Sequence, residues 1–220
     1  MKVSELITVF RREADDTAQP YLWSDPELIE FAADAEYEAC RRARLITDQT
    51  TTAICQIAVT AGNPSLTLDS RVLFVRRAKI DGQDQPLRSV DYRDLDEQVP
   101  GWEDLEGTPR AFVRNLETGK IRLYRSPDAD CTLRLRVVRL PIQRLTTKEQ
   151  TPEIHERFHR SLVQWMLFRA FSKKDTQTQD DQRAATALAL FEQEFGQRSS
   201  AIEETWLENN IGDTSTQGEF

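Results

Sequence analysis

The segment HERFH, residues 155–159, carries two histidines four positions apart with a glutamate directly after the first. On an α-helix this spacing brings both imidazoles to one face, where they can bind Zn²⁺ while the glutamate polarises a metal-bound water. A zinc hydrolase built on this motif would use His155, Glu156 and His159.

The rest of the sequence argues against this chemistry. The chain has only two histidines, so a third protein ligand would have to be a carboxylate, and Glu192 and Glu194 are the downstream candidates. His155 also falls in the first turn after Pro152, whereas metal-binding histidines need apolar neighbours and orienting partners. We therefore predict that HERFH is a chance match at an exposed helix start with one histidine turned inward. We predict no catalytic residue, no metal site and no cofactor, and the zinc hydrolase stays as the alternative.

Other sequence signals of catalysis are absent. The chain contains no G-x-S-x-G, Walker or G-x-G-x-x-G motif, and its eight glycines provide little material for a phosphate-binding loop. Its 220 residues suffice for one large or two small domains, and 39% hydrophobic with 30% charged residues predicts a soluble protein with much polar surface. We expect no secretion signal and no membrane span, and three widely spaced cysteines indicate a reducing compartment.

The elements that must position these residues follow from the hydrophobic period. Apolar residues every three to four positions predict helices near both ends, and β-branched or alternating segments predict strands between them. The sequence SDPE, residues 24–27, is a capping box with proline in the first turn, and Gly196 is a typical residue just after a helix. The predicted helices are 3–14, 24–46, 151–173 and 177–195. The predicted strands are 50–60, 72–80, 111–114, 120–124 and 132–140, with a short strand and a helical turn within 87–97.

This order of elements predicts an α+β fold in which both ends of the chain form a helical domain and a β-rich module is inserted between them. We expect the helical domain to consist of residues 1–50 and 151–196. The inserted antiparallel β-module should consist of residues 51–150. Residues 197–220 show little periodicity and are expected to form an extended C-terminal tail.

The net charge of −8 is unevenly distributed. Residues 110–150 carry a charge of +6, whereas the segments before and after are acidic. The basic side chains decorate the predicted hairpin and the strand after it: Arg110, Arg114, Lys120, Arg122, Arg125, Arg134, Arg136, Arg139 and Arg144. They can form the solvated face of an antiparallel sheet, a subunit interface that pairs with acids of a neighbour, or a nucleic-acid-binding surface, and the sequence leaves these three open.

Two further features indicate contacts with other chains. The predicted 24–46 helix has mixed charge on its surface, and Trp206 stands among glutamates in the tail, where it is either solvated or an anchor on a partner. The residues that we predict at subunit or partner interfaces are Arg41, Arg42, Arg122, Arg134, Arg136 and Trp206.

Taken in order, several short segments resemble the bacteriophage head-to-tail adaptor proteins, the neck components that lie beneath the portal. The resemblance extends over about residues 20–198 and depends on the order and spacing of the segments, because none is specific alone. His155 departs from the family pattern as we know it, which supports the chance origin of HERFH. The matching segments are W-S-D-P-E-L (23–28), A-E-Y-E-A-C-R-R-A (35–43), L-D-S-R-V-L (68–73), P-G-W (100–102), T-G-K-I-R-L-Y (118–124), P-D-A-D (127–130), R-L-P (139–141), P-E-I (152–154), F-H-R-S-L-V-Q-W (158–165), R-A (169–170) and F-E-Q-E-F-G (191–196).

The resemblance implies a structural virion protein that has no enzymatic activity and no required cofactor. It would form a homo-oligomeric ring, typically of twelve subunits, that extends the DNA channel below the portal protein and docks tail or nozzle proteins. Viral DNA would pass through the lumen without sequence-specific binding, and the acidic ends of the chain would suit a channel wall that repels phosphates. The resemblance also implies a location in the virion neck, assembly in the host cytoplasm and no membrane contact.

Overall fold

A computed structural model describes residues 1–114, 116–174, 179–200 and 203. It confirms the α+β class predicted from the sequence. Leaving aside the residues after Arg198, the chain forms two compact units, which are described here one at a time. The helical unit consists of Met1–Ile46 and Leu140–Arg198, and the β-unit consists of Thr47–Arg139.

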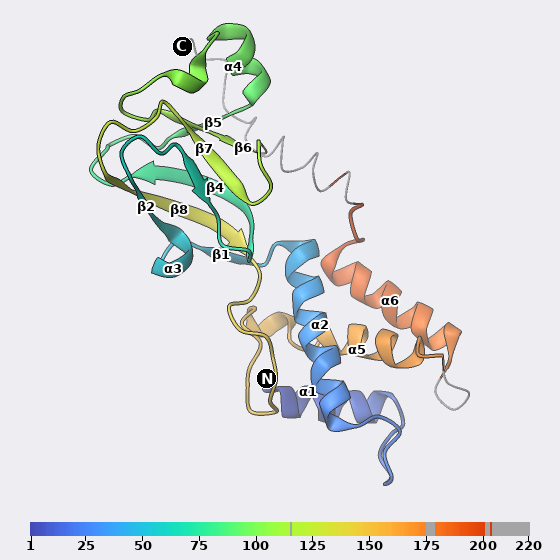
Figure 1. Cartoon of the computed structure of the whole chain (residues 1–220). Helices are drawn as coiled ribbons and strands as arrows, with labels where there is room; N and C mark the ends of the chain where they lie inside the picture. Colours follow the sequence, from blue (N-terminus) through green and yellow to red (C-terminus); the bar gives the residue numbers. More distant parts are fainter. Residues whose placement is uncertain (115, 175–178, 201–202, 204–220) are drawn as a thin grey trace. The chain divides into compact units, whose positions relative to one another are not determined.

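The helical unit packs four α-helices around one apolar core (Figure 1). The aromatic ring of Trp23, which is 1% exposed, lies edge-on to the rings of Phe10 and Phe171, and this contact joins the N-terminal and C-terminal segments of the unit. The elements of the unit are α1 (Val3–Glu13), α2 (Asp25–Ala43), the 3₁₀ helix η2 (Glu156–Phe158), α5 (Leu162–Phe171) and α6 (Asp181–Phe195).

Two helix ends lie where local sequence signals predict them. Helix α2 begins after Ser24 with Pro26 in its first turn, but the predicted capping box does not form, because the Ser24 side chain makes no capping hydrogen bond. Helix α6 ends at Gly196, whose φ of 83° favours a residue without a side chain. The prediction that the second helix continues to Ile46 is wrong, because the backbone of Arg44 turns to a φ of 54° and Ile46 begins a strand.

The β-unit consists of two four-stranded sheets. In the first sheet, strand β8 (Cys131–Arg139) pairs with β1 (Ile46–Asp48), β2 (Gln56–Val59) and β4 (Val72–Ile80). The second sheet has the order β3 (Ser65–Thr67), β7 (Lys120–Tyr124), β6 (Ala111–Arg114) and β5 (Arg88–Val90). Strands β2, β3, β4 and β6 pair antiparallel with β7 or β8, as the prediction of an antiparallel module requires, whereas β5 runs parallel to β6.

The inner faces of the two sheets share one core. Leu133, Leu135 and Val137 alternate along β8 and are at most 2% exposed, as their spacing predicts, and they belong to the same apolar cluster as Ile121 and Leu123 of β7. The side chains of β8 at the intervening positions therefore point away from this core.

The outer face of the second sheet is covered by α4 (Tyr92–Gln98) and the 3₁₀ helix η1 (Trp102–Asp104) (Figure 1). Leu95 and Trp102 form a separate buried cluster with Val113 of β6 and pack against Tyr124 of β7. From one side to the other, the β-unit thus has a helical layer, the second sheet, the shared core and the first sheet.

The predicted strand at 50–60 is only half correct. Its first part is a short helix, α3 (Thr52–Cys55), and the strand β2 begins at Gln56. The cause is Asp48, whose carboxylate accepts hydrogen bonds from the backbone amides of Thr50 and Thr51 at 2.9 and 3.1 Å and from the Thr51 hydroxyl at 2.7 Å. These local bonds to the backbone favour a turn over an extended chain.

The predicted helix start at residue 151 is also wrong, because α5 begins at Leu162. Hydrogen bonds to side chains take the backbone groups that an α-helix would use. The amide of Glu153 donates to the buried carboxylate of Glu36, and the carbonyl oxygen of Ile154 lies 2.9 Å from Nε2 of His159. Ile154 itself is 3% exposed and belongs to the apolar core of the helical unit.

Candidate functional site

The HERFH segment does not have the geometry of a zinc motif. Its residues form η2 and the turns beside it instead of an α-helix. His155 is exposed and its Nδ1 accepts from the amide of Arg157 at 3.3 Å. His159 is 2% exposed, as expected for the histidine turned inward, and its ring nitrogens lie 2.9 Å from the Ile154 carbonyl and 2.9 Å from the amino group of Met1. His159 therefore bridges protein groups with both nitrogens. Over the described ranges, no three His, Cys, Asp or Glu side chains are grouped to hold a metal ion.

Glu36 is the buried titratable group behind this segment. Its side chain is 1% exposed, and Oε1 accepts the Glu153 amide at 2.5 Å. Burial raises the pKa of Glu36 to about 7, against the effect of hydrogen bonds from the backbone of Glu153 and Ile154. No protein partner lies at its Oε2 within the part of the chain that the structure describes. The geometry assigns Glu36 to anchoring the 153–154 backbone, because this backbone donates the hydrogen bonds to its carboxylate.

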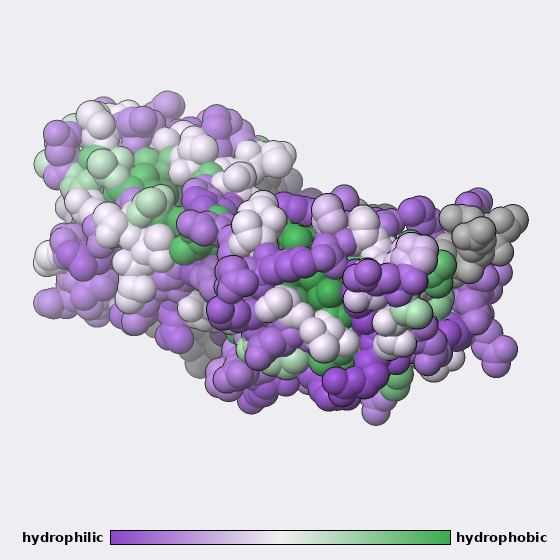
Figure 2. All heavy atoms as spheres, turned by 90° about the horizontal axis from the view of Figure 1, so that it is seen from below, coloured by the Kyte–Doolittle hydropathy of each residue, from purple (hydrophilic) through white to green (hydrophobic). Residues whose placement is uncertain are grey.

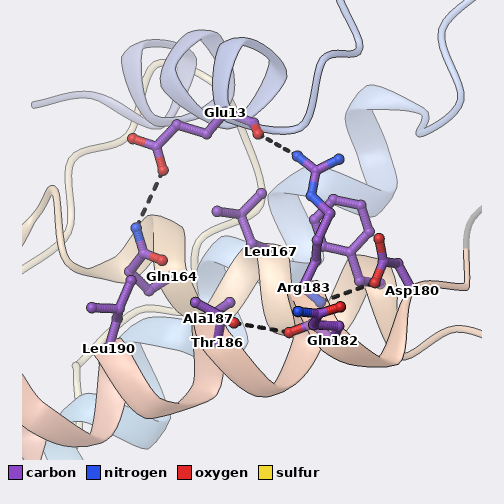
Figure 3. A pocket seen from close by; sticks show the side chains of 10 residues that line it. Glu13, Gln164, Leu167, Asp180, Gln182, Arg183, Thr186, Ala187 and Leu190 are labelled. Carbon is purple, nitrogen blue, oxygen red and sulfur yellow. Dashed lines mark hydrogen bonds between the residues drawn. The ribbon is translucent and has the colours of Figure 1, made fainter.

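A groove of about 370 Å³ lies between α1, α5 and α6 (Figure 3). Its polar side chains are already bonded across it. The Gln164 amide donates to the Glu13 carboxylate at 3.2 Å, and the Arg183 guanidinium donates to the Glu13 carbonyl oxygen at 2.7 Å and lies over the ring of Phe171. Leu190, which is 47% exposed, forms part of the rim. Because these polar groups bond to one another across the groove, we interpret it as a contact between packed helices and not as a ligand site.

Two of the residues predicted at interfaces lie on α2. The Arg42 side chain is 5% exposed, and its guanidinium donates to Glu38 at 2.8 Å and to Glu192 of α6 at 3.4 Å. It also lies over the ring of Trp165 at 5.2 Å. Arg42 thus links three helices of its own unit, while Arg41 is half-buried beside it. An intersubunit role for either residue stays a prediction.

Arg122 is placed on the outer face of the second sheet, beneath the helical layer. Its guanidinium donates to the carbonyl oxygen of Glu103 at 2.9 Å and lies 5.5 Å from the ring centre of Trp102. The side chain therefore fixes η1 to strand β7. As with Arg42, a role between subunits stays a prediction.

Arg134 and Arg136 point away from the core on the outer face of the first sheet. Both side chains are exposed, and Arg134 donates to Asp81 at 2.8 Å. Strand β4 adds two cations that the sequence analysis did not single out, because Arg77 lies directly opposite Arg136 and Lys79 directly opposite Arg134. We call these four side chains the basic face. The signal that could have found it was Arg-Arg-x-Lys in the predicted 72–80 strand, but the partner of that strand was unknown.

The two ends of the β-unit are held together by a buried ion pair. The Arg139 guanidinium, at the end of β8, donates to the Asp48 carboxylate, at the end of β1, at 2.6 Å, and both side chains are 5% exposed. Burial opposes ionisation of Asp48, but hydrogen bonds from Thr51, Thr50 and Arg139 prevail and hold its pKa well below the ordinary value. The pair therefore joins the last residue of β8 to the last residue of β1.

Few large apolar side chains are exposed among the described residues. On the face drawn in Figure 2, hydrophilic residues surround separate hydrophobic areas. The large hydrophobic side chains that are exposed include Leu22 at 52% and Leu105 at 37%. No described helix is both long and apolar enough to cross a membrane. Trp206 and most of the predicted tail lie outside the described residues.

The chain belongs to the SU10 adaptor protein family, whose model matches residues 1–212. This is a family of phage head-to-tail adaptors, so the resemblance seen in the sequence is confirmed. Family membership implies a structural connector in the virion neck that interacts with portal and tail proteins. A comparison with curated proteins found no match.

Proposed function

We propose that the chain assembles as a ring, of twelve subunits as the family resemblance implies, beneath the portal of a bacteriophage capsid. The ring extends the DNA channel and provides the surface on which tail or nozzle proteins dock. The observation that carries this proposal is the match of the family model to nearly the whole chain, residues 1–212.

The contacts within the chain support a structural role. The Arg42 side chain and the Asp48–Arg139 pair are buried and join elements that are distant in sequence. Such contacts hold each unit rigid, as a structural component of a virion requires. Of the predicted interface residues that the structure describes, Arg134 and Arg136 have exposed side chains. Their role between subunits belongs to this proposal.

The test is assembly on the portal. The full chain is mixed with the portal ring of the same virus, and the products are imaged by electron microscopy and weighed by native mass measurement. We expect a closed ring of twelve copies below the portal. Portal rings that stay bare at saturating chain concentration would contradict the proposal.

The zinc-hydrolase alternative makes the opposite prediction for purified protein. Zinc would bind in a one-to-one ratio and be lost on His159→Ala. The positions of both His159 nitrogens beside the Ile154 carbonyl and the Met1 amino group argue against that outcome.

A further inference from the structure

The basic face brings like charges together inside the first sheet. Arg77 is the direct cross-strand neighbour of Arg136, and Lys79 is that of Arg134. Like charges directly opposite each other destabilise an antiparallel pair. Asp81 compensates Arg134, whereas Arg77 and Arg136 have no ion-pair partner in the part of the chain that the structure describes. The positive charge of this face is thus left to be neutralised from outside.

Protection of a sheet edge does not explain the whole face. Charged residues on an edge strand discourage unwanted pairing, but the outer edge of β4 is bridged to Leu87 at Ala78, between Arg77 and Lys79. Strand β8 is flanked on both sides, since Arg134 lies opposite Lys79 of β4 and opposite Gln56 of β2. Arg134 therefore lies in the middle of the sheet, where no edge needs protection.

The opposite side of the β-unit carries the complementary charge. The segment 91–106, which contains α4 and η1, has seven acidic residues and one arginine. We call it the acidic layer. All seven acidic residues are exposed, and within the described residues none of them has an ion pair: Asp91, Asp94, Asp96, Glu97, Glu103, Asp104 and Glu106.

The two surfaces face in opposite directions because of the alternation in the sheets. In β8, Leu133 and Leu135 point to the shared core, so Arg134 and Arg136 point outward from the first sheet. The acidic layer packs through its apolar cluster on the outer face of the second sheet. The β-unit therefore has a positive face on one side and a negative layer on the other.

We propose that the basic face of one copy docks on the acidic layer of the next copy around the ring. The inference rests on the proposed ring, in which each contact is head-to-tail and joins two different patches of the same chain. Two complementary patches on opposite sides of one unit are the arrangement that such a contact needs.

A second copy fits both surfaces better than DNA does. Phosphates would neutralise Arg77 and Arg136 but would leave the acidic layer without a partner. Docking between copies gives both surfaces a partner in one contact, because every copy carries one basic face and one acidic layer. Charges arranged in this way give an interface its orientation and exclude the reversed contact.

The test uses charge reversal on the full chain. The variant Arg77→Glu/Arg136→Glu reverses the basic face, and Asp94→Lys/Glu97→Lys reverses the acidic layer. All four side chains are exposed, so circular dichroism should show an intact fold. We expect each double variant to need at least about tenfold more protein for half-maximal ring assembly, with or without the portal. An equimolar mixture of the two variants should assemble at the wild-type concentration, because reversed faces then meet reversed layers.

A matched control changes the net charge equally at another place. Arg12 and Lys174 of the helical unit are exposed, and neither has an ion pair in the described ranges. The variant Arg12→Glu/Lys174→Glu should assemble like the wild type. Higher salt should weaken wild-type assembly, since the docking contacts are screened.

The outcomes separate the docking from the ring. Rings that form from both double variants at the wild-type concentration would overturn the docking and keep the proposed function. Bare portals, together with variants that bind each other but not themselves, would overturn the ring and keep the docking. Wild-type protein that never self-associates would overturn both. Normal assembly of Arg77→Glu/Arg136→Glu with weakened binding of duplex DNA would assign the face to nucleic acid and overturn the docking.

Discussion

Replacing Glu36 by glutamine should stabilise the helical unit above neutral pH. A glutamine keeps a carbonyl oxygen to accept the Glu153 amide, and it removes a negative charge from a side chain that is 1% exposed. The variant therefore separates two contributions of Glu36, the hydrogen bond that it accepts and the charge that it buries.

The magnitude follows from the pKa of Glu36. The ordinary pKa of 4.5 is raised to about 7 in the folded protein, chiefly by burial. Between these two values the folded state keeps a proton that the unfolded chain releases, so the free energy of unfolding decreases as the pH rises. The stabilising contribution is complete below the unfolded pKa and is lost by about pH 7. At about 1.4 kcal/mol per pKa unit, this loss is about 3 kcal/mol.

Urea unfolding, followed by circular dichroism of the helices, measures the difference between wild type and Glu36→Gln. The two proteins should be similar at about pH 4.5, and the variant should be more stable by up to about 3 kcal/mol at about pH 8. The control is Glu30→Gln, which removes an exposed acid from the same helix and should change stability little at either pH. A variant that is less stable than wild type at pH 8 would refute the reasoning, because it would mean that the 153–154 amides need the full charge.

Three further predictions concern stability and metal binding. Asp48→Asn should lower the free energy of unfolding of the β-unit by about 3–5 kcal/mol, because Arg139 is left buried without its partner. Since the pKa of Asp48 is lowered, this difference should hold above the unfolded value of 3.8 and shrink in acid, and a small loss at neutral pH would argue against the buried pair. Trp165→Ala should cost about 3–5 kcal/mol, because its side chain is 9% exposed and packs in the core, whereas an unchanged melting temperature would place it outside. His155→Ala should leave the melting temperature unchanged with or without zinc, while His159→Ala should cost about 1–3 kcal/mol; stoichiometric zinc in the wild type would show that the motif binds metal after all.

The parts of the fold that could be predicted are those in which local sequence and tertiary structure agree. The alternation of Leu133, Leu135 and Val137 identified strand β8 and its inner face, and Gly196 identified the end of α6. In both cases a few neighbouring residues contain the whole physical reason, which is a period of two or a positive φ.

The errors occurred where side-chain hydrogen bonds or strand pairing, and not the hydrophobic period, decide the backbone. The carboxylate of Glu36, which is distant in sequence, binds the amide of Glu153, and the ring of His159 lies against the carbonyl oxygen of Ile154 five residues earlier. The α-helix therefore begins only at Leu162, and the hydrophobic period does not indicate these bonds. The parallel pairing of β5 with β6 also depends on which strands meet. Strand pairing is tertiary information that a single sequence does not carry.

The five arginines of the predicted interface set were chosen from charge alone, and charge does not distinguish a cation that is bonded within its own chain from one that is exposed on a surface. Arg42 and Arg122 have their partners inside the chain, whereas Arg136 has an exposed side chain on a basic face. The second half of that face, Arg77 and Lys79, lies in a stretch whose total charge is negative, so the regional sum concealed it.

The division of the helical unit between the two ends of the chain sets an order of events at the ribosome. Helices α1 and α2 are made first, but α5, against which Trp23 packs through Phe171, follows only after the β-unit of about 90 residues. At about 5–20 residues synthesised per second, the apolar faces of α1 and α2 lack their packing partner α5 for roughly 5–20 seconds. All the strands of the β-unit are synthesised within that interval, so the β-unit can fold before the helices of the helical unit have packed together. The early helices would then be the segment of the nascent chain with the greatest need of a chaperone.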